Sequence, residues 1–195
     1  MKITADQVKT LREKTGLSVM ECKKALEETG GNLDQAMEHL KALGLQMVEK
    51  KAARQTPEGK IGAYIHTNGR IGVLIEVNCE TDFVARTEDF QTLVKNLCLQ
   101  IAATSPSWID RDAVPQEVLT EQRRIFQQTM SEKNATDMEK IINAKMEEFY
   151  QQHVLLEQKF IRDESLTIKD LLSQKVAQLG ENIRVKRFVR FALGE

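Results

Sequence analysis

The residues best suited to chemistry or binding lie at positions 77–86, which read VNCETDFVAR. Phe83 stands there among acidic and basic residues, between the end of a strand-like run and the start of a helical pattern. Loops held between rigid elements commonly carry function, so Phe83 is a candidate for a protruding wedge. The structural alternative is that Thr81 or Asp82 caps a helix and Phe83 turns into the core. Composition alone favours this alternative.

Two further surfaces are candidates for binding a partner. In residues 4–44, three short helices leave a surface around residues 16–20 that they cannot all bury, which indicates either a docking module or a small stabilising domain. In residues 183–193, four basic residues occur with no acid, a pattern that suits contact with RNA phosphates. Aromatic residues accompany them only at Phe188 and Phe191, and a solvated strand face is the commoner meaning. We therefore expect no direct binding of nucleic acid.

Catalytic and metal-binding motifs are missing from the sequence. It contains neither the GxxxxGK[ST] phosphate loop nor a GxSxG nucleophile. Its 3 histidines lie far apart, and its 3 cysteines, Cys22, Cys79 and Cys98, never form a CxxC pair. We therefore expect no metal, no cofactor and no covalent chemistry, and we interpret the cysteines as reduced, mostly buried thiols.

The length and charge of the chain exclude several classes of protein. A length of 195 residues allows one core plus a small module but not two large domains. A formal net charge of −1 provides no overall field to attract nucleic acid or an anionic membrane. No apolar run approaches the ~20 residues of a membrane span. These features predict a soluble protein that is not exported and has no membrane partner.

The elements that must position these residues fall into two groups. Residues 1–45 read as a module of three short helices, the third of which ends at Gly44. The expected helix caps are Thr4, Ser18 and Asn32. Residues 46–56 suit a polar connecting helix or linker, and residues 57–195 form the core.

The core is expected to begin with a hairpin, because strand-like runs at 61–65 and 71–77 flank Asn68-Gly69. Helical patterns follow as far as Gly180, and residues 183–193 then alternate as a last strand. One face of that strand would carry Ile183, Val185, Val189, Phe191 and Leu193, and the charged face would carry Arg184, Lys186 and Arg190. The predicted fold class is α+β, with a helical module followed by a three-stranded antiparallel sheet packed by helices.

Several of these segments are similar to a known family. Residues 8–16 (VKTLREKTG), 22–26 (CKKAL) and 30–36 (GGNLDQA) resemble the N-terminal ubiquitin-associated-like (UBA-like) domain of the elongation factor Ts family. Residues 76–86 resemble the signature at that family's core. The motifs lie in the expected order, and the resemblance covers the whole chain.

The resemblance implies a guanine-nucleotide exchange factor for elongation factor Tu, the GTPase that delivers aminoacyl-tRNA. The segment inserted into Tu would be Thr81, Asp82, Phe83 and Val84. Phe83 would wedge apart packed elements of Tu and so dislodge Mg²⁺ and promote the release of GDP. The residues that dock the N-terminal module on the nucleotide domain of Tu would be Arg12, Val19, Met20 and Lys23.

Chain length adds a prediction about assembly. Longer members of the family have a core of two related halves, whereas 195 residues leave room for one. We therefore predict a homodimer in which a second copy supplies the second half. The expected location is the bacterial cytoplasm, with an organelle stroma as the alternative. The alternative function is a UBA-like docking or RNA-binding accessory protein without exchange activity.

Overall fold

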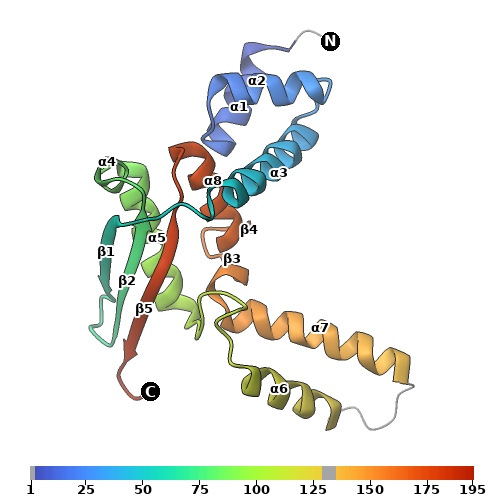
Figure 1. Cartoon of the computed structure of the whole chain (residues 1–195), viewed down its shortest axis with the longest axis vertical. Coiled ribbons are helices and arrows are strands. Elements are labelled where there is room, and N and C mark those ends of the chain that lie inside the picture. Colours follow the sequence, from blue (N-terminus) through green and yellow to red (C-terminus); the bar gives the residue numbers. More distant parts are fainter. Residues whose placement is uncertain (1–2, 129–134) are drawn as a thin grey trace.

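The chain begins with three helices in a computed structural model that describes residues 3–128 and 135–195. They are α1 (Ala5–Thr15), α2 (Val19–Glu28) and α3 (Leu33–Lys51) (Figure 1). Thr4 and Ser18 each form a capping box, and Gly16 ends α1 in the left-handed conformation. The helices share a core of Leu11, Leu17, Cys22, Ala25, Leu26, Ala36 and Leu40. The UBA-like character of this module stays a prediction.

Helix α3 does not end at Gly44, as the sequence pattern predicted, but continues to Lys51. Gly44 is buried, and a Cβ built on it would lie 3.7 Å from the carbonyl oxygen of Ser173 in α8 (Ile168–Leu179). The glycine therefore serves close packing of two helices, and a helix interior tolerates glycine where packing offsets its cost. The expected linker thus begins inside a helix. The division of the chain at residues 45 and 56 stays a prediction.

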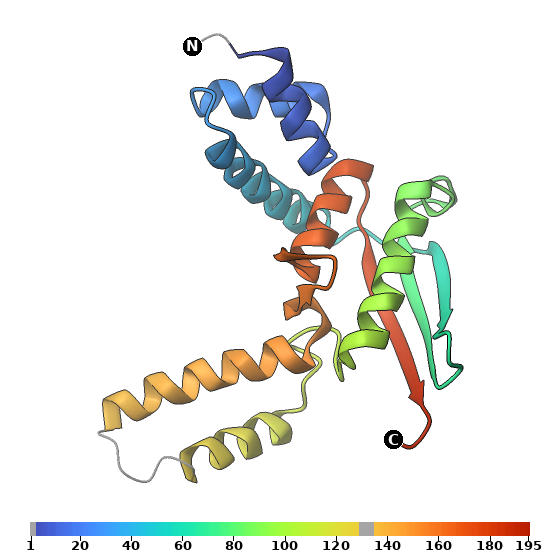
Figure 2. The ribbon, with the colours of Figure 1, turned by 180° about the vertical axis from the view of Figure 1, so that it is seen from behind.

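The core contains the expected three-stranded antiparallel sheet. Its strands, in the order β1-β2-β5, are β1 (Glu58–Ile65), β2 (Ile71–Cys79) and β5 (Arg184–Ala192). Helix α5 (Glu88–Thr104) covers one face of this sheet, as seen from behind in Figure 2. On its other side, α5 packs against α8. The sheet and α8 therefore enclose α5 in a layered core.

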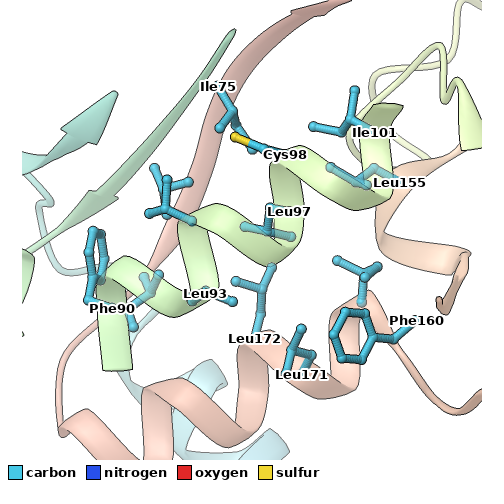
Figure 3. Close-up of a cluster of buried hydrophobic side chains, with 14 of the residues drawn as sticks. Ile75, Phe90, Leu93, Leu97, Cys98, Ile101, Leu155, Phe160, Leu171 and Leu172 are labelled. Atoms are coloured by element: carbon cyan, nitrogen blue, oxygen red, sulfur yellow. The ribbon is translucent and has the colours of Figure 1, made fainter. Parts of the chain in front are cut away.

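The centre of the core is built from the apolar stripe of α5. Figure 3 shows side chains of this stripe between Ile75 of the sheet and the leucines of α8, and all are buried. The stripe consists of Phe90, Leu93, Val94, Leu97, Cys98 and Ile101. A two-stranded ribbon closes the end of the core through Phe160, and its strands are β3 (Lys159–Phe160) and β4 (Asp163–Thr167).

A helical hairpin extends from the end of the core that lies away from the N-terminal module (Figures 1 and 2). Its helices are α6 (Gln116–Gln128) and α7 (Ala135–His153), followed by the short helix η1 (Leu155–Glu157). Arg111 fixes the base of the hairpin, since its guanidinium lies 2.6 Å from a carboxylate oxygen of Glu147 and 2.8 Å from one of Glu157. The hairpin and its base share an apolar cluster that is separate from the main core and consists of Val114, Ile142, Met146, Phe149 and Val154.

The last strand departs from the predicted alternation at Lys186. Val77 pairs with Val185 but Glu76 pairs with Arg187, so Lys186 is an extra residue in a β-bulge. Because side chains alternate with period 2, the bulge reverses the faces of all later residues. Val189, Phe191 and Leu193, expected to share the face of Ile183 and Val185, are therefore exposed. Arg190 lies instead toward α5, where it donates to the carbonyl of Ala102 at 3.5 Å.

Close packing of β1 on α5 depends on Gly62. A Cβ built there would lie 2.4 Å from Cγ1 of Val94 and 3.0 Å from Sγ of Cys98. We expect Gly62→Ala to lower the free energy of unfolding by about 1–3 kcal/mol, measured by urea denaturation, because overpacking forces the helix away from the sheet.

The matched control for this change is Gly72→Ala in β2. The new methyl group would meet only the end of the flexible Ile65 side chain, at 3.1 Å. We expect a smaller loss of stability than for Gly62→Ala. Equal losses for the two variants would contradict the importance of the approach between β1 and α5.

Candidate functional site

The segment containing Phe83 forms a one-turn helix directly after β2. This helix, α4 (Asp82–Ala85), is capped by Thr81, whose hydroxyl oxygen accepts a hydrogen bond from the backbone N–H of Val84 at 3.4 Å. Asp82 forms an ion pair with Arg86 at 2.8 Å across the turn. An isolated turn this short is not stable by itself, so its neighbours must hold it.

Phe83 is the most exposed large apolar side chain among the described residues, with 78% of its surface accessible. The structural alternative, in which Phe83 turns into the core, is therefore wrong. The two residues that follow it do turn inward: Ala85 is buried, and Val84 packs against the main core. Thr81 caps the helix, as the same alternative proposed. The turn is thus anchored on one side while it presents Phe83 on the other.

The four sequence-predicted residues of this segment consequently differ in what they offer a partner. Thr81 and Phe83 are exposed, whereas Asp82 is engaged with Arg86 and Val84 is half-buried in the core. Only an exposed large apolar side chain can bury a large area on contact with another protein. Phe83 is therefore the residue that can change environment most on binding.

A carboxylate from a distant part of the chain completes the turn. Oε2 of Glu181 accepts hydrogen bonds from the backbone N–H groups of Glu80 and Thr81, both at 3.0 Å. Its Oε1 accepts from the Thr81 hydroxyl at 2.6 Å. The carboxylate of Glu80 accepts in return from the backbone N–H of Asn182 at 2.7 Å. Sequence reasoning did not identify Glu181, because no local pattern connects residues one hundred positions apart.

The thiol of Cys79 lies under the turn and is chemically unreactive. Burial and the nearby charge of Glu181 raise its pKa to about 11, so that it stays protonated at neutral pH. The protonated thiol donates to the carbonyl of Thr81 at 3.1 Å. Cys22, Cys79 and Cys98 are all buried and unpaired, which confirms the reading of the cysteines as reduced buried thiols.

The N-terminal module carries a second candidate surface. Arg12, Val19 and Lys23 line a hollow of about 410 Å³ between α1 and α2, together with Ile3 and Val8. The hollow thus combines apolar side chains with three cationic ones, Lys9, Arg12 and Lys23.

Met20 does not line this hollow but stands next to Val19 and is 74% exposed. The structure therefore brings together three of the four docking residues that the resemblance implied. Both this surface and α4 lie toward the end of the molecule opposite the α6–α7 hairpin (Figures 1 and 2).

A third surface, which the sequence did not predict, is the face of the sheet turned away from α5. We call it the open sheet face. It exposes six large apolar side chains: Ile61, Ile65, Leu74, Val189, Phe191 and Leu193. Within this face, β2 and β5 place Leu74 opposite Val189 and Gly72 opposite Phe191. A group of apolar side chains on this scale indicates a contact surface.

The described residues hold neither a cluster of metal-ligating side chains nor a membrane-spanning helix. No group of three or more His, Cys, Asp or Glu side chains is placed there to hold a metal ion. Among residues 3–128 and 135–195, no helix is long and apolar enough to cross a membrane.

Comparison with known proteins gives one consistent result. A sequence model of the family described as "Elongation factor TS" matches residues 2–195. The chain is 52% identical over 197 residues to Elongation factor Ts of Coprothermobacter proteolyticus, covering 100% of both chains. It is 50% identical over 197 residues to the Fervidobacterium nodosum protein of that name, again covering 100% of both. The chain is 48% identical over 195 residues to Elongation factor Ts of Thermotoga neapolitana, covering 100% of this chain and 99% of the relative.

Proposed function

The chain belongs to the elongation factor Ts family, and we propose on this basis that it is a guanine-nucleotide exchange factor for elongation factor Tu. The observation that carries the proposal is Phe83, exposed on a turn that the rest of the fold anchors. An exchange factor needs no catalytic groups of its own, because it makes and breaks no covalent bond.

The proposed mechanism acts on the site that holds the nucleotide in Tu. In GTPases of this kind, a phosphate-binding loop and Mg²⁺ together hold the diphosphate, so disturbing either one weakens the binding of GDP. Phe83 inserts between packed elements of Tu and displaces the groups that hold Mg²⁺. Burying one Phe contributes roughly 1.5–3 kcal/mol, and anchors of this kind dominate many interfaces. Thr81, Asp82 and Val84 form the turn that carries it.

The N-terminal module provides a second attachment in this proposal. The hollow lined by Arg12, Val19 and Lys23, with Met20 beside it, docks on the nucleotide domain of Tu. Two attachments on one partner let the docking module hold Tu while Phe83 acts. The core makes a further contact with Tu, through surfaces other than the turn at residues 81–84 and the hollow of the N-terminal module.

Assembly as a homodimer is part of the proposal, with the open sheet face as its interface. Two sheets that pack face to face bury their apolar side chains in a layer about 10 Å thick. A two-fold axis brings the same patch of each copy together, so no second kind of surface is needed. The three relatives named above are bacterial, which supports the bacterial cytoplasm as the proposed location.

Thermodynamic linkage supplies the test of exchange. The factor by which this chain lowers the affinity of Tu for GDP must equal the factor by which GDP lowers the affinity of Tu for this chain. We expect the dissociation constant for nucleotide-free Tu, measured by calorimetry, to be lower than that for Tu·GDP by at least about tenfold. Equal affinities for the two forms would identify a docking protein without exchange activity.

The RNA-binding alternative loses its main support in the structure. It required Arg184, Lys186 and Arg190 on one charged strand face, but the bulge at Lys186 turns Arg190 toward α5. A salt-sensitive RNA complex abolished by changing these three residues would support the alternative. We expect no such complex.

A further inference from the structure

We propose that Glu181 is a positioning residue that holds the turn at residues 81–84 so that Phe83 is presented before a partner arrives. This inference rests on the proposed function and adds to it a residue far from the signature-like segment at residues 76–86. Glu181 lies in the turn between α8 and β5, about one hundred residues from the turn that it contacts.

The first step of the argument is the number and kind of hydrogen bonds. One carboxylate accepts two backbone N–H groups and one hydroxyl, at 3.0, 3.0 and 2.6 Å. Hydrogen bonds to an ionised acceptor are roughly twice as strong as neutral ones. No other side chain among the described residues makes as many hydrogen bonds to residues 80–84. Glu181 is therefore the principal polar restraint on it.

The second step links Glu181 to the helix cap. A hydroxyl has one O–H to donate, and Thr81 donates it in the hydrogen bond to Glu181. The lone pairs of the hydroxyl then remain for the N–H of Val84, which is the bond that caps α4. Glu181 thus fixes both the backbone before the cap and the orientation of the cap itself. Phe83 lies inside the capped turn, so its direction depends on the same carboxylate.

The third step is the rigidity of the turn on which Glu181 stands. The Asn182 side chain donates to the carbonyl of Arg54 at 2.9 Å, and its backbone N–H donates to Glu80 at 2.7 Å. Lys51, at the end of α3, donates to the carbonyl of Gly180. The turn is therefore held by the chain at and just after the end of α3 and by Glu80, directly after β2. A carboxylate on such a support can orient a wedge.

A prediction that does not involve Tu tests the restraint directly. In Glu181→Ala, we expect the amides of Glu80, Thr81 and Val84 to exchange with deuterium at least about tenfold faster than in the wild type. Amides in the centre of α5 should keep their protection, because the main core is untouched. Unchanged exchange at the three amides would overturn the proposal whatever the activity of the chain.

The functional test separates positioning from the wedge itself. A protein whose competent form is only partly populated binds more weakly in proportion to that population. With a fluorescent GDP on Tu, we expect Glu181→Ala to raise the half-saturating concentration of the chain about tenfold and to change the maximal release rate by less than about twofold. Loss of Phe83 should instead lower the maximal rate. A half-saturating concentration equal to that of the wild type would overturn the proposal.

Two further variants guard against a general loss of structure. Glu181→Gln keeps an acceptor oxygen for the two N–H groups, so it should restore the half-saturating concentration to within about threefold of the wild type. Glu117→Ala, on exposed α6, removes an unrelated carboxylate and should have no effect. An equal defect in Glu181→Ala and Glu181→Gln would overturn the assignment. Failure of the wild type to accelerate GDP release from Tu would overturn the proposed function. Deuterium exchange would still test whether Glu181 restrains the turn.

Discussion

Phe83→Ala is expected to lower the maximal rate of GDP release from Tu by about 10- to 100-fold. The reason is that Phe83 is the one side chain of its turn that is both large and free to enter a partner, with 78% of its surface exposed. In the proposed mechanism, Phe83→Ala removes interactions made only while Tu is being opened, and each 1.4 kcal/mol lost is about tenfold in rate. Release can be followed with a fluorescent GDP at saturating concentrations of the variant.

The fold itself should be unaffected by this change, because Phe83 contributes little to the core. Urea denaturation should therefore give the same free energy of unfolding for Phe83→Ala and for the wild type. Ile161→Ala is the matched control, since Ile161 is 41% exposed in the β3–β4 ribbon and has no proposed contact with Tu. A release rate in Phe83→Ala equal to that of Ile161→Ala would contradict the wedge mechanism.

Leu74→Glu combined with Phe191→Glu is expected to convert a homodimer into a monomer. Both side chains lie on the open sheet face, where they are 47% and 69% exposed in the single chain. A carboxylate placed between two packed sheets would lose its hydration, and the two-fold symmetry would bring four added carboxylates into one interface. We expect association to weaken at least about 100-fold, measured by light scattering across a range of concentrations.

The control for this experiment is Ile161→Glu, which adds a charge to an exposed apolar position away from the open sheet face. That variant should remain a dimer. A double variant that stayed dimeric would contradict the open sheet face as the interface. A wild type that is monomeric at working concentration would disprove the homodimer itself.

Local features of this fold were predictable because each has a short-range physical cause. The Asn68-Gly69 turn joins β1 and β2 as expected, with Gly69 in the left-handed conformation that this turn requires. Thr4 and Ser18 cap their helices through residues three positions away. The apolar stripe of α5 follows helical periodicity and is buried throughout. In these cases a window of a few residues contains all the interacting groups.

Features that depend on tertiary contacts were not predictable in this way. Gly44 resembles a helix end in sequence, but its packing against α8 keeps α3 continuous. The bulge at Lys186 is a property of pairing between β2 and β5, and it moves Val189 and Phe191 to the open sheet face. Glu181 meets its partners only after the sheet forms. Each of these depends on residues far away along the chain.

The candidate site shows how the two kinds of inference differ. Composition favoured a buried Phe83, because most large aromatic side chains of small domains are needed in the core. The family resemblance instead implied that Phe83 is available to a partner, and the structure exposes it. The residues that anchor the turn, Val84 and Ala85, supply the burial that composition had assigned to Phe83.

The most direct test of the central claim is the release of a fluorescent GDP from purified Tu in the presence of excess unlabelled nucleotide. Release should be slow for Tu alone and should accelerate with increasing concentrations of this chain until it saturates, because the proposed mechanism opens the nucleotide site while the chain is bound. A rate that stays at the value for Tu alone at every concentration, with binding to Tu demonstrated in parallel, would contradict an exchange function.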